Sequence, residues 1–136
     1  VAPREALLRA FSLTVDGEPV GKARARVTAH GAYTPEKTRT AQERISWETK
    51  MWWGNQPLME GPVEVTVKAW CTPPKRNGKS YPSRLDVDNA LKLVLDALNG
   101  VVWKDDRQVV KATIEKWWAV GIEPFTGIKV VEVRRG

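Results

Sequence analysis

The chain has 136 residues, a formal net charge of +6 and a sequence pI of about 9.7, and this length suits one domain over residues 1–136 with its own core. Seven tryptophans and a 42% apolar content exclude a disordered chain. No apolar run reaches the roughly 20 residues that cross a bilayer, and with Cys71 as the single cysteine no disulfide forms within these residues. The excess of basic side chains favours a polyanionic partner such as nucleic acid.

The first half of the chain predicts a strand, an extended segment and a helix. Residues 9–15 alternate loosely between apolar and polar side chains, which is typical of a strand. Residues 20–34 are expected to be extended, with a turn at their His-Gly pair. A helix is expected from Thr34-Pro35 to Trp53, because threonine is a favoured N-cap and proline a favoured first helical residue.

The second half predicts three strands and one more helix. Residues 62–71 alternate most cleanly, and a loop rich in Pro, Lys, Gly and Ser follows over 72–84. A helix is expected over 88–99, with one apolar side made of Leu91, Val94, Leu95 and Leu98. Strands over 108–118 and 127–134 complete the pattern. The sequence thus predicts a single α+β domain, with a mixed sheet flanked by two main helices.

Two aspartates stand two residues apart where the loop meets the second helix. An extended backbone points Asp86 and Asp88 to the same side, where both can offer oxygens to one hard cation such as Mg²⁺. Lys92 follows Asp88 by one helical turn and would place an ammonium beside the cation. If the next strand lies beside the helix start, Asp105 or Asp106 would complete a set suited to metal-assisted phosphodiester hydrolysis.

The same residues also have a purely structural interpretation. Asp88 suits a helix N-cap, Asp88 and Lys92 suit an exposed ion pair, and Asp105-Asp106 suits a turn. Chemistry and spacing alone leave both interpretations open.

Basic residues gather in two segments. Lys22, Arg24 and Arg26 recur at every second position, so an extended backbone gives them one face suited to DNA phosphates; a strand edge protected by charge has the same pattern. The loop before Asp86 is also basic, and we expect it to guide DNA toward the metal through Lys75, Arg76, Lys79 and Arg84.

Most tryptophans are expected to pack in the core or in a dimer interface rather than to stack on bases, because large aromatics dominate the energetics of both. This group contains Trp47, Trp52, Trp53, Trp117 and Trp118. Trp103 is expected to pack beneath the acidic residues that follow it.

The order and spacing of these residues resemble the RusA family of Holliday-junction resolvases, small endodeoxyribonucleases often encoded by phages. The likeness rests on Asp86-Val87-Asp88-Asn89, Lys92, Leu95-Asp96-Ala97-Leu98-Asn99, Trp103-Lys104-Asp105-Asp106 and Gln108-Val109. Gly21-Lys22-Ala23-Arg24-Ala25-Arg26 and Tyr33-Thr34-Pro35 are similar too, so the likeness covers roughly residues 10–118. Many members have proline before the first aspartate, where this chain has Leu85.

This resemblance implies a RusA-like fold and a homodimer that uses Mg²⁺ to make paired cuts in opposing strands of a four-way DNA junction, in recombination and repair. Carried over residue by residue, it assigns Asp86, Asp88 and Asp106 to the metal and Lys92 to catalysis, and it favours Asp106 over Asp105. We expect a cytoplasmic location, in a bacterial or phage-infected cell, and no membrane partner.

Two other functions remain open. A noncatalytic basic DNA-binding protein would keep the basic segments and use the acidic cluster only as structure, so it would show no metal-dependent cleavage. An enzyme for another phosphate ester would keep the metal. A phosphatase with a nucleophilic aspartate needs an apolar strand directly before Asp86, whereas a polar loop stands there.

Overall fold

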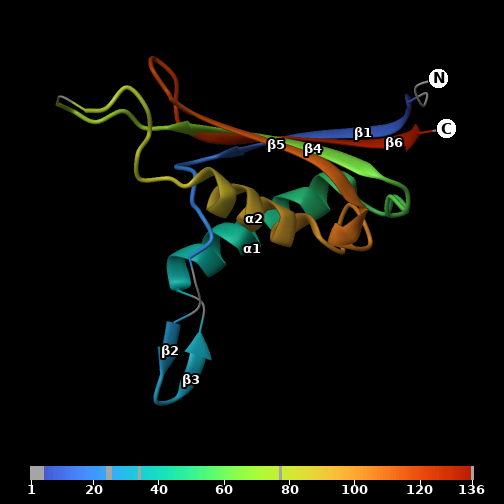
Figure 1. Cartoon of the computed structure of the whole chain (residues 1–136), viewed down its shortest axis with the longest axis horizontal. Helices are drawn as coiled ribbons and strands as arrows, with labels where there is room; N and C mark the ends of the chain where they lie inside the picture. Colours follow the sequence, from blue (N-terminus) through green and yellow to red (C-terminus); the bar gives the residue numbers. More distant parts are fainter. Residues whose placement is uncertain (1–4, 24–25, 34, 77, 136) are drawn as a thin grey trace.

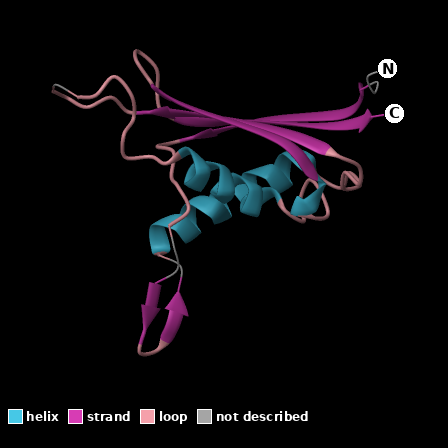
Figure 2. Ribbon diagram, in the orientation of Figure 1, coloured by secondary structure: helices cyan, strands magenta, loops and turns pink. Residues whose placement is uncertain are grey.

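The computed structural model, which describes residues 5–23, 26–33, 35–76 and 78–135, has a mixed sheet with two helices on one face (Figure 2). The elements are β1 (Glu5–Asp16), β2 (Arg26–Thr28), β3 (Gly31–Tyr33), α1 (Glu36–Trp53), β4 (Val63–Cys71), α2 (Val87–Leu98), the 3₁₀ turn η1 (Asp106–Gln108), β5 (Val109–Trp118) and β6 (Phe125–Arg135). The α+β class is confirmed, and the predicted strands and helices are present with ends shifted by a few residues.

The main sheet has the strand order β1-β6-β4-β5, and β4 and β5 are its parallel pair. Parallel neighbours need a long crossover, which α2 provides between them. The start of α2 therefore follows the carboxyl end of β4, and the turn before β5 lies at the opposite end of the sheet (Figure 1). The short hairpin of β2 and β3 lies beyond the helices, away from this sheet.

The core lies between the sheet and the helices. β4 alternates as predicted, and every second side chain from Val63 to Cys71 is buried. The buried side of α2 differs from the prediction, because it is made of Ala90, Leu93, Val94, Ala97 and Leu98. Leu91 and Leu95 are only half-buried and pack against this core, so part of the apolar surface of α2 stays exposed.

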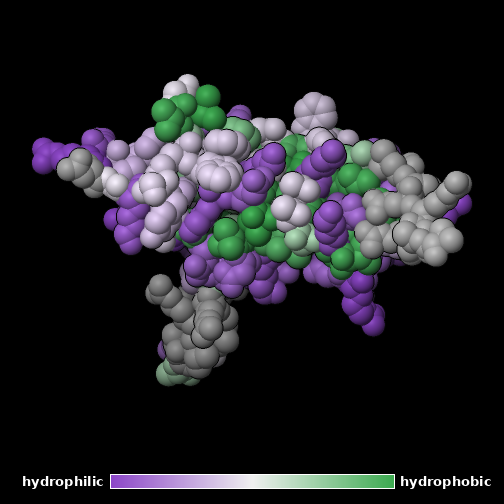
Figure 3. Space-filling view, turned by 45° about the horizontal axis from the view of Figure 1, so that its top comes forward, coloured by the Kyte–Doolittle hydropathy of each residue, from purple (hydrophilic) through white to green (hydrophobic). Residues whose placement is uncertain are grey.

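The other face of the sheet has no helix over it. In β4, the residues between the buried valines are Glu64, Thr66 and Lys68, which alternate onto this face. A space-filling view shows hydrophilic side chains across it, with smaller hydrophobic areas between them (Figure 3). This alternation is typical of a sheet with one covered and one solvated face.

The tryptophans divide into three groups, of which the half-buried one contains Trp70 and Trp118. Trp53 and Trp103 are buried, at 4% and 0% exposure, as core packing requires. Trp47, Trp52 and Trp117 are at least half exposed, so core packing was the wrong prediction for these three. Their part in a dimer interface stays a prediction.

Two details of the chain bear on the predictions. α1 begins at Glu36 with Pro35 as its N-cap, one residue later than expected, and the predicted N-cap Thr34 lies outside the described residues. Burial, helped by the charge of Glu18, raises the pKa of the Cys71 thiol to about 11, so this cysteine stays protonated at neutral pH. Among the described helices, none combines the length and apolar character needed to cross a membrane.

Candidate functional site

Asp86 and Asp88 lie at the start of α2 with both carboxylates exposed. Asp86 is the N-cap residue through its backbone, whose carbonyl accepts from the Ala90 N–H at 2.9 Å, while its side chain makes no capping bond. The proposed N-cap role of Asp88 is therefore wrong. Asn89 contacts both carboxylates: its side-chain amide donates to Asp86 Oδ2 at 3.3 Å, and its backbone N–H donates to Asp88 Oδ1 at 3.0 Å.

The segment that begins the first basic motif packs against this helix start. The Lys22 N–H donates to the Asn89 carbonyl at 2.8 Å. A Cβ atom on Gly21 would come within 3.1 Å of Asn89 Cβ, so a residue without a side chain is favoured there. These contacts join segments that lie far apart in the sequence, so no local sequence pattern predicts them.

Lys92 turns toward Asp96 rather than toward Asp88. Its ammonium lies 3.7 Å from Asp96 Oδ2, the same oxygen that Lys22 Nζ approaches to 3.0 Å. Lys22 also donates to Gln42 Oε1 at 2.7 Å, so its charge is engaged within the fold. Lys92 stays 65% exposed and accessible to a bound phosphate. Among the described residues, the alternative ion pair of Asp88 with Lys92 is not formed.

The two aspartates after α2 have different surroundings. Asp105 caps η1: its Oδ1 accepts from the Arg107 N–H at 2.9 Å and its Oδ2 from the Arg107 guanidinium at 3.2 Å. These two bonds, the backbone one first, lower the pKa of Asp105. Asp106 Oδ1 accepts from the Trp103 indole N–H at 2.8 Å. Asp105 therefore forms the predicted turn, and both of its carboxylate oxygens already accept hydrogen bonds from Arg107.

Gln108 holds this turn in place. Its side-chain oxygen accepts from the N–H groups of Lys104 and Asp105, both at 2.9 Å. Its side-chain nitrogen donates to the carbonyls of Met59 and Gly61, at 2.8 and 2.9 Å. With the fully buried Trp103 beneath Asp106, as predicted, the turn has a rigid support.

Asp106 does not meet Asp86 and Asp88 within one chain. α2 has 12 residues, which at 1.5 Å per residue separates its ends by about 18 Å. Trp103, the partner of Asp106, pairs with Asn99 just after the end of α2, whereas Asp86 stands before its start. Accordingly, no three His, Cys, Asp or Glu side chains gather into a metal-binding group among the described residues.

The predicted DNA-binding residues lie mainly in the loop of residues 72–85, hereafter the basic loop. Lys75, Arg76, Lys79 and Arg84 are all exposed there. Arg24 lies outside the described residues, and of Arg26 only the backbone, in β2, is described. Of the predicted DNA-binding residues, those of the basic loop stand nearest to Asp86 in the sequence.

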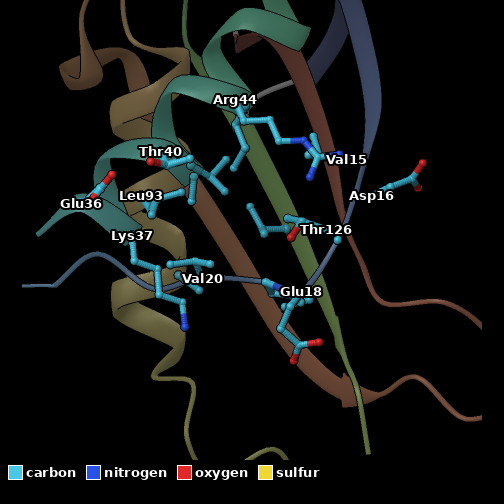
Figure 4. A pocket seen from close by; sticks show the side chains of 18 residues that line it. Val15, Asp16, Glu18, Val20, Glu36, Lys37, Thr40, Arg44, Leu93 and Thr126 are labelled. Carbon is cyan, nitrogen blue, oxygen red and sulfur yellow. The ribbon is translucent and has the colours of Figure 1, made fainter.

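A cavity of about 490 Å³ lies between α1 and the sheet. Val15, Val20 and Leu93 give it an apolar lining, while Arg44 and Lys37 reach it from α1 (Figure 4). None of Asp86, Asp88 and Asp106 lines it. The carboxylates expected to bind metal therefore lie at the exposed ends of α2 and not in this cavity, whose own acidic lining residues are Asp16, Glu18 and Glu36.

Comparison with known proteins gives two matches. The family model described as "Endodeoxyribonuclease RusA" matches residues 16–130. A curated protein of Bacillus subtilis strain 168, "Uncharacterized protein YqaN", is 29% identical over 142 aligned residues, which cover 90% of this chain and 96% of that protein.

Proposed function

This chain belongs to the RusA endodeoxyribonuclease family, and from that membership we propose a Mg²⁺-dependent endonuclease that resolves four-way DNA junctions by paired symmetric cuts. The observation that carries the proposal is the exposed pair Asp86 and Asp88 at a helix N-terminus, directly after a basic loop. Carboxylates attract a divalent cation, and the loop's cations attract the DNA backbone that the cation would act on.

One chain supplies two of the three carboxylates that the proposal assigns to the metal. Asp86 and Asp88 are exposed and share Asn89 as a neighbour, which fits a hard cation that keeps several waters. The third, Asp106, stands at the other end of α2. We therefore assign each metal site to Asp86 and Asp88 of one protomer and Asp106 of the partner subunit. Bound there, Mg²⁺ would lower the pKa of a water and neutralise charge on the phosphate.

The remaining residues of the site bind and orient DNA. Lys92 is exposed and pairs with Asp96 at 3.7 Å, a weak contact that leaves the ammonium available to a phosphate oxygen. Asp96 is itself held by Lys22, whose ammonium lies 3.0 Å from the same carboxylate oxygen. Lys75, Arg76 and Lys79 give the basic loop its affinity for the backbone.

The outer surface of the helical layer suits a homodimer. On α2, Val87 is 38% exposed and Leu91 and Leu95 are half-buried. These three residues follow one another at intervals of four, so they form an apolar stripe along the helix. On α1, Trp47 and Met51 are 61% and 64% exposed and also stand four residues apart. Two such layers related by a two-fold axis, with their α2 helices antiparallel, would bring the start of one α2 beside the end of the other.

Introducing negative charge on this apolar surface is expected to separate the protomers. Trp47→Glu combined with Met51→Glu should shift the mass in light scattering from a dimer to the 15.3 kDa chain and abolish junction cleavage. Both side chains are exposed, so the circular dichroism spectrum should not change. Val120→Glu is the matched control, since Val120 is 76% exposed in the turn between β5 and β6. A dimeric, active double variant would refute this interface.

The proposed function is tested by incubating the protein with a labelled synthetic four-way junction, with and without Mg²⁺. The expected result is symmetric nicks in two opposing strands that require both the junction and the metal, with a linear duplex of the same sequence left intact. Binding without any nick in Mg²⁺ or Mn²⁺ would favour the noncatalytic DNA-binding alternative. Cleavage of the linear duplex at the same rate would keep the nuclease and reject its selectivity for junctions.

A further inference from the structure

The basic loop is fastened to the end of β5 at two points. The Trp118 indole N–H donates to the Lys79 carbonyl at 2.9 Å. Lys116 Nζ donates to the Leu85 carbonyl at 2.6 Å. Leu85 is the residue directly before Asp86, so the second contact lies at the boundary between the loop and the proposed metal ligands.

The ammonium group of Lys116 makes its contacts within the fold. It is half-buried on β5, opposite Ala69 of β4. Within the part of the chain that the structure describes, its ammonium has no salt bridge to a carboxylate. It lies 5.9 Å from the centre of the Tyr81 ring, which Lys79 Nζ also approaches to 5.8 Å. A cation that donates to a carbonyl forms a stronger bond than a neutral donor does, so the loop end is held firmly.

Leu85 is fixed through its side chain as well as through its carbonyl. The side chain is 8% exposed and packs with Ala69, Cys71 and Ala90 in a second core cluster. One residue later the chain reaches Asp86, whose carboxylate is exposed and makes no capping bond of its own. The orientation of the Asp86 and Asp88 side chains at the protein surface therefore depends on the position of Leu85.

From these contacts we infer that Lys116 is a positioning residue for Asp86 and Asp88, an inference that rests on the proposed function of those two aspartates. Lys116 touches neither DNA nor metal in this role. It sets the position of the loop end, so that the two carboxylates and the cations of Lys79 and Arg84 lie in one fixed arrangement. Removing it leaves the residues of the site present but misplaced.

Lys116→Met removes the donor and keeps most of the side-chain volume. Because a small misplacement of reacting groups costs up to about a hundredfold in rate, we expect kcat for junction cleavage to fall by about ten- to a hundredfold, with KM within about threefold of wild type. Lys116→Arg, which can still donate to the carbonyl, should restore most of the rate. Lys111→Met, an exposed change in the same strand, is the control and should cleave as wild type does.

A second readout needs no activity. Amide hydrogen exchange of residues 83–89 should be several times faster in Lys116→Met than in wild type, and unchanged in Lys111→Met. If Lys116→Met does not fold, Lys116→Leu replaces it, since leucine likewise has no donor for the Leu85 carbonyl. Wild-type kcat and wild-type exchange in these variants would overturn the inference. If Asp88→Asn is inactive while Lys116→Met is fully active, only this inference fails; if wild type itself cleaves no junction, the proposed function fails.

Discussion

Asp88→Asn is expected to lower the rate of junction cleavage in Mg²⁺ by about two to three orders of magnitude, the usual effect of losing one group that stabilises transition-state charge. Junction affinity should stay within about threefold, because phosphate contacts by the basic residues supply most of it. Asparagine keeps the shape of the side chain and the Oδ1 acceptor that takes the Asn89 N–H at 3.0 Å. Only the charge and one metal-binding oxygen are lost. Single-turnover cleavage and gel-shift titration in EDTA measure the two quantities.

Asp16→Asn is the matched control for this variant. Asp16 is an exposed aspartate at the end of β1, so its loss changes the net charge by the same amount at a place outside the proposed site. It should cleave junctions at the wild-type rate. Full activity of Asp88→Asn would show that Asp88 is not a metal ligand, and equal losses in both variants would point to net charge rather than to a site.

Local sequence patterns predicted most of the fold because the relevant physics is local. The alternation in β4 and the glycine after α1 are strong signals, and both elements lie where the pattern placed them. The apolar side of α2 was predicted less well. Leu91 and Leu95 fit a helical stripe as well as Leu93 does, and only the position of the sheet decides which of these leucines is buried.

The site shows the same division between local and tertiary information. The sequence placed Asp86 and Asp88 where the loop meets the second helix, and both are exposed there, but the extended backbone expected through both ends at Asp86, because Asp88 stands in the first turn of α2. The four-residue rule pairs Lys92 equally with Asp88 and with Asp96, and the contact of Lys22 with Asp96 comes from a distant segment that the rule does not include. The place of Asp106 depends on the parallel crossover, which spacing alone does not reveal.

Residues with supporting roles were harder to find from the sequence. Gln108 and Lys116 act through hydrogen bonds to backbone carbonyls of other segments, Met59 and Gly61 in one case and Leu85 in the other. A carbonyl acceptor is present at every position of the chain, so the sequence holds no pattern that marks such a partner. Only the three-dimensional arrangement of the segments reveals these contacts.

Mixed dimers of Asp88→Asn and Asp106→Asn show whether two protomers together build each metal site. Each variant alone should be inactive, and Asp106→Asn should fold because asparagine can still accept from the Trp103 indole. In a mixed dimer, one site receives both substitutions. The other site is intact, because the Asp106→Asn protomer supplies its Asp86 and Asp88 and the Asp88→Asn protomer supplies its Asp106.

The experiment mixes the two purified variants, allows subunit exchange, confirms the mixed dimers by mass-tagged subunits and measures junction nicking in Mg²⁺. Since random exchange makes half the dimers mixed and each has one intact site, recovery to about a quarter of the wild-type site activity is expected, as single nicks rather than paired cuts. No recovery of cleavage, with mixed dimers present, would contradict a site shared between protomers.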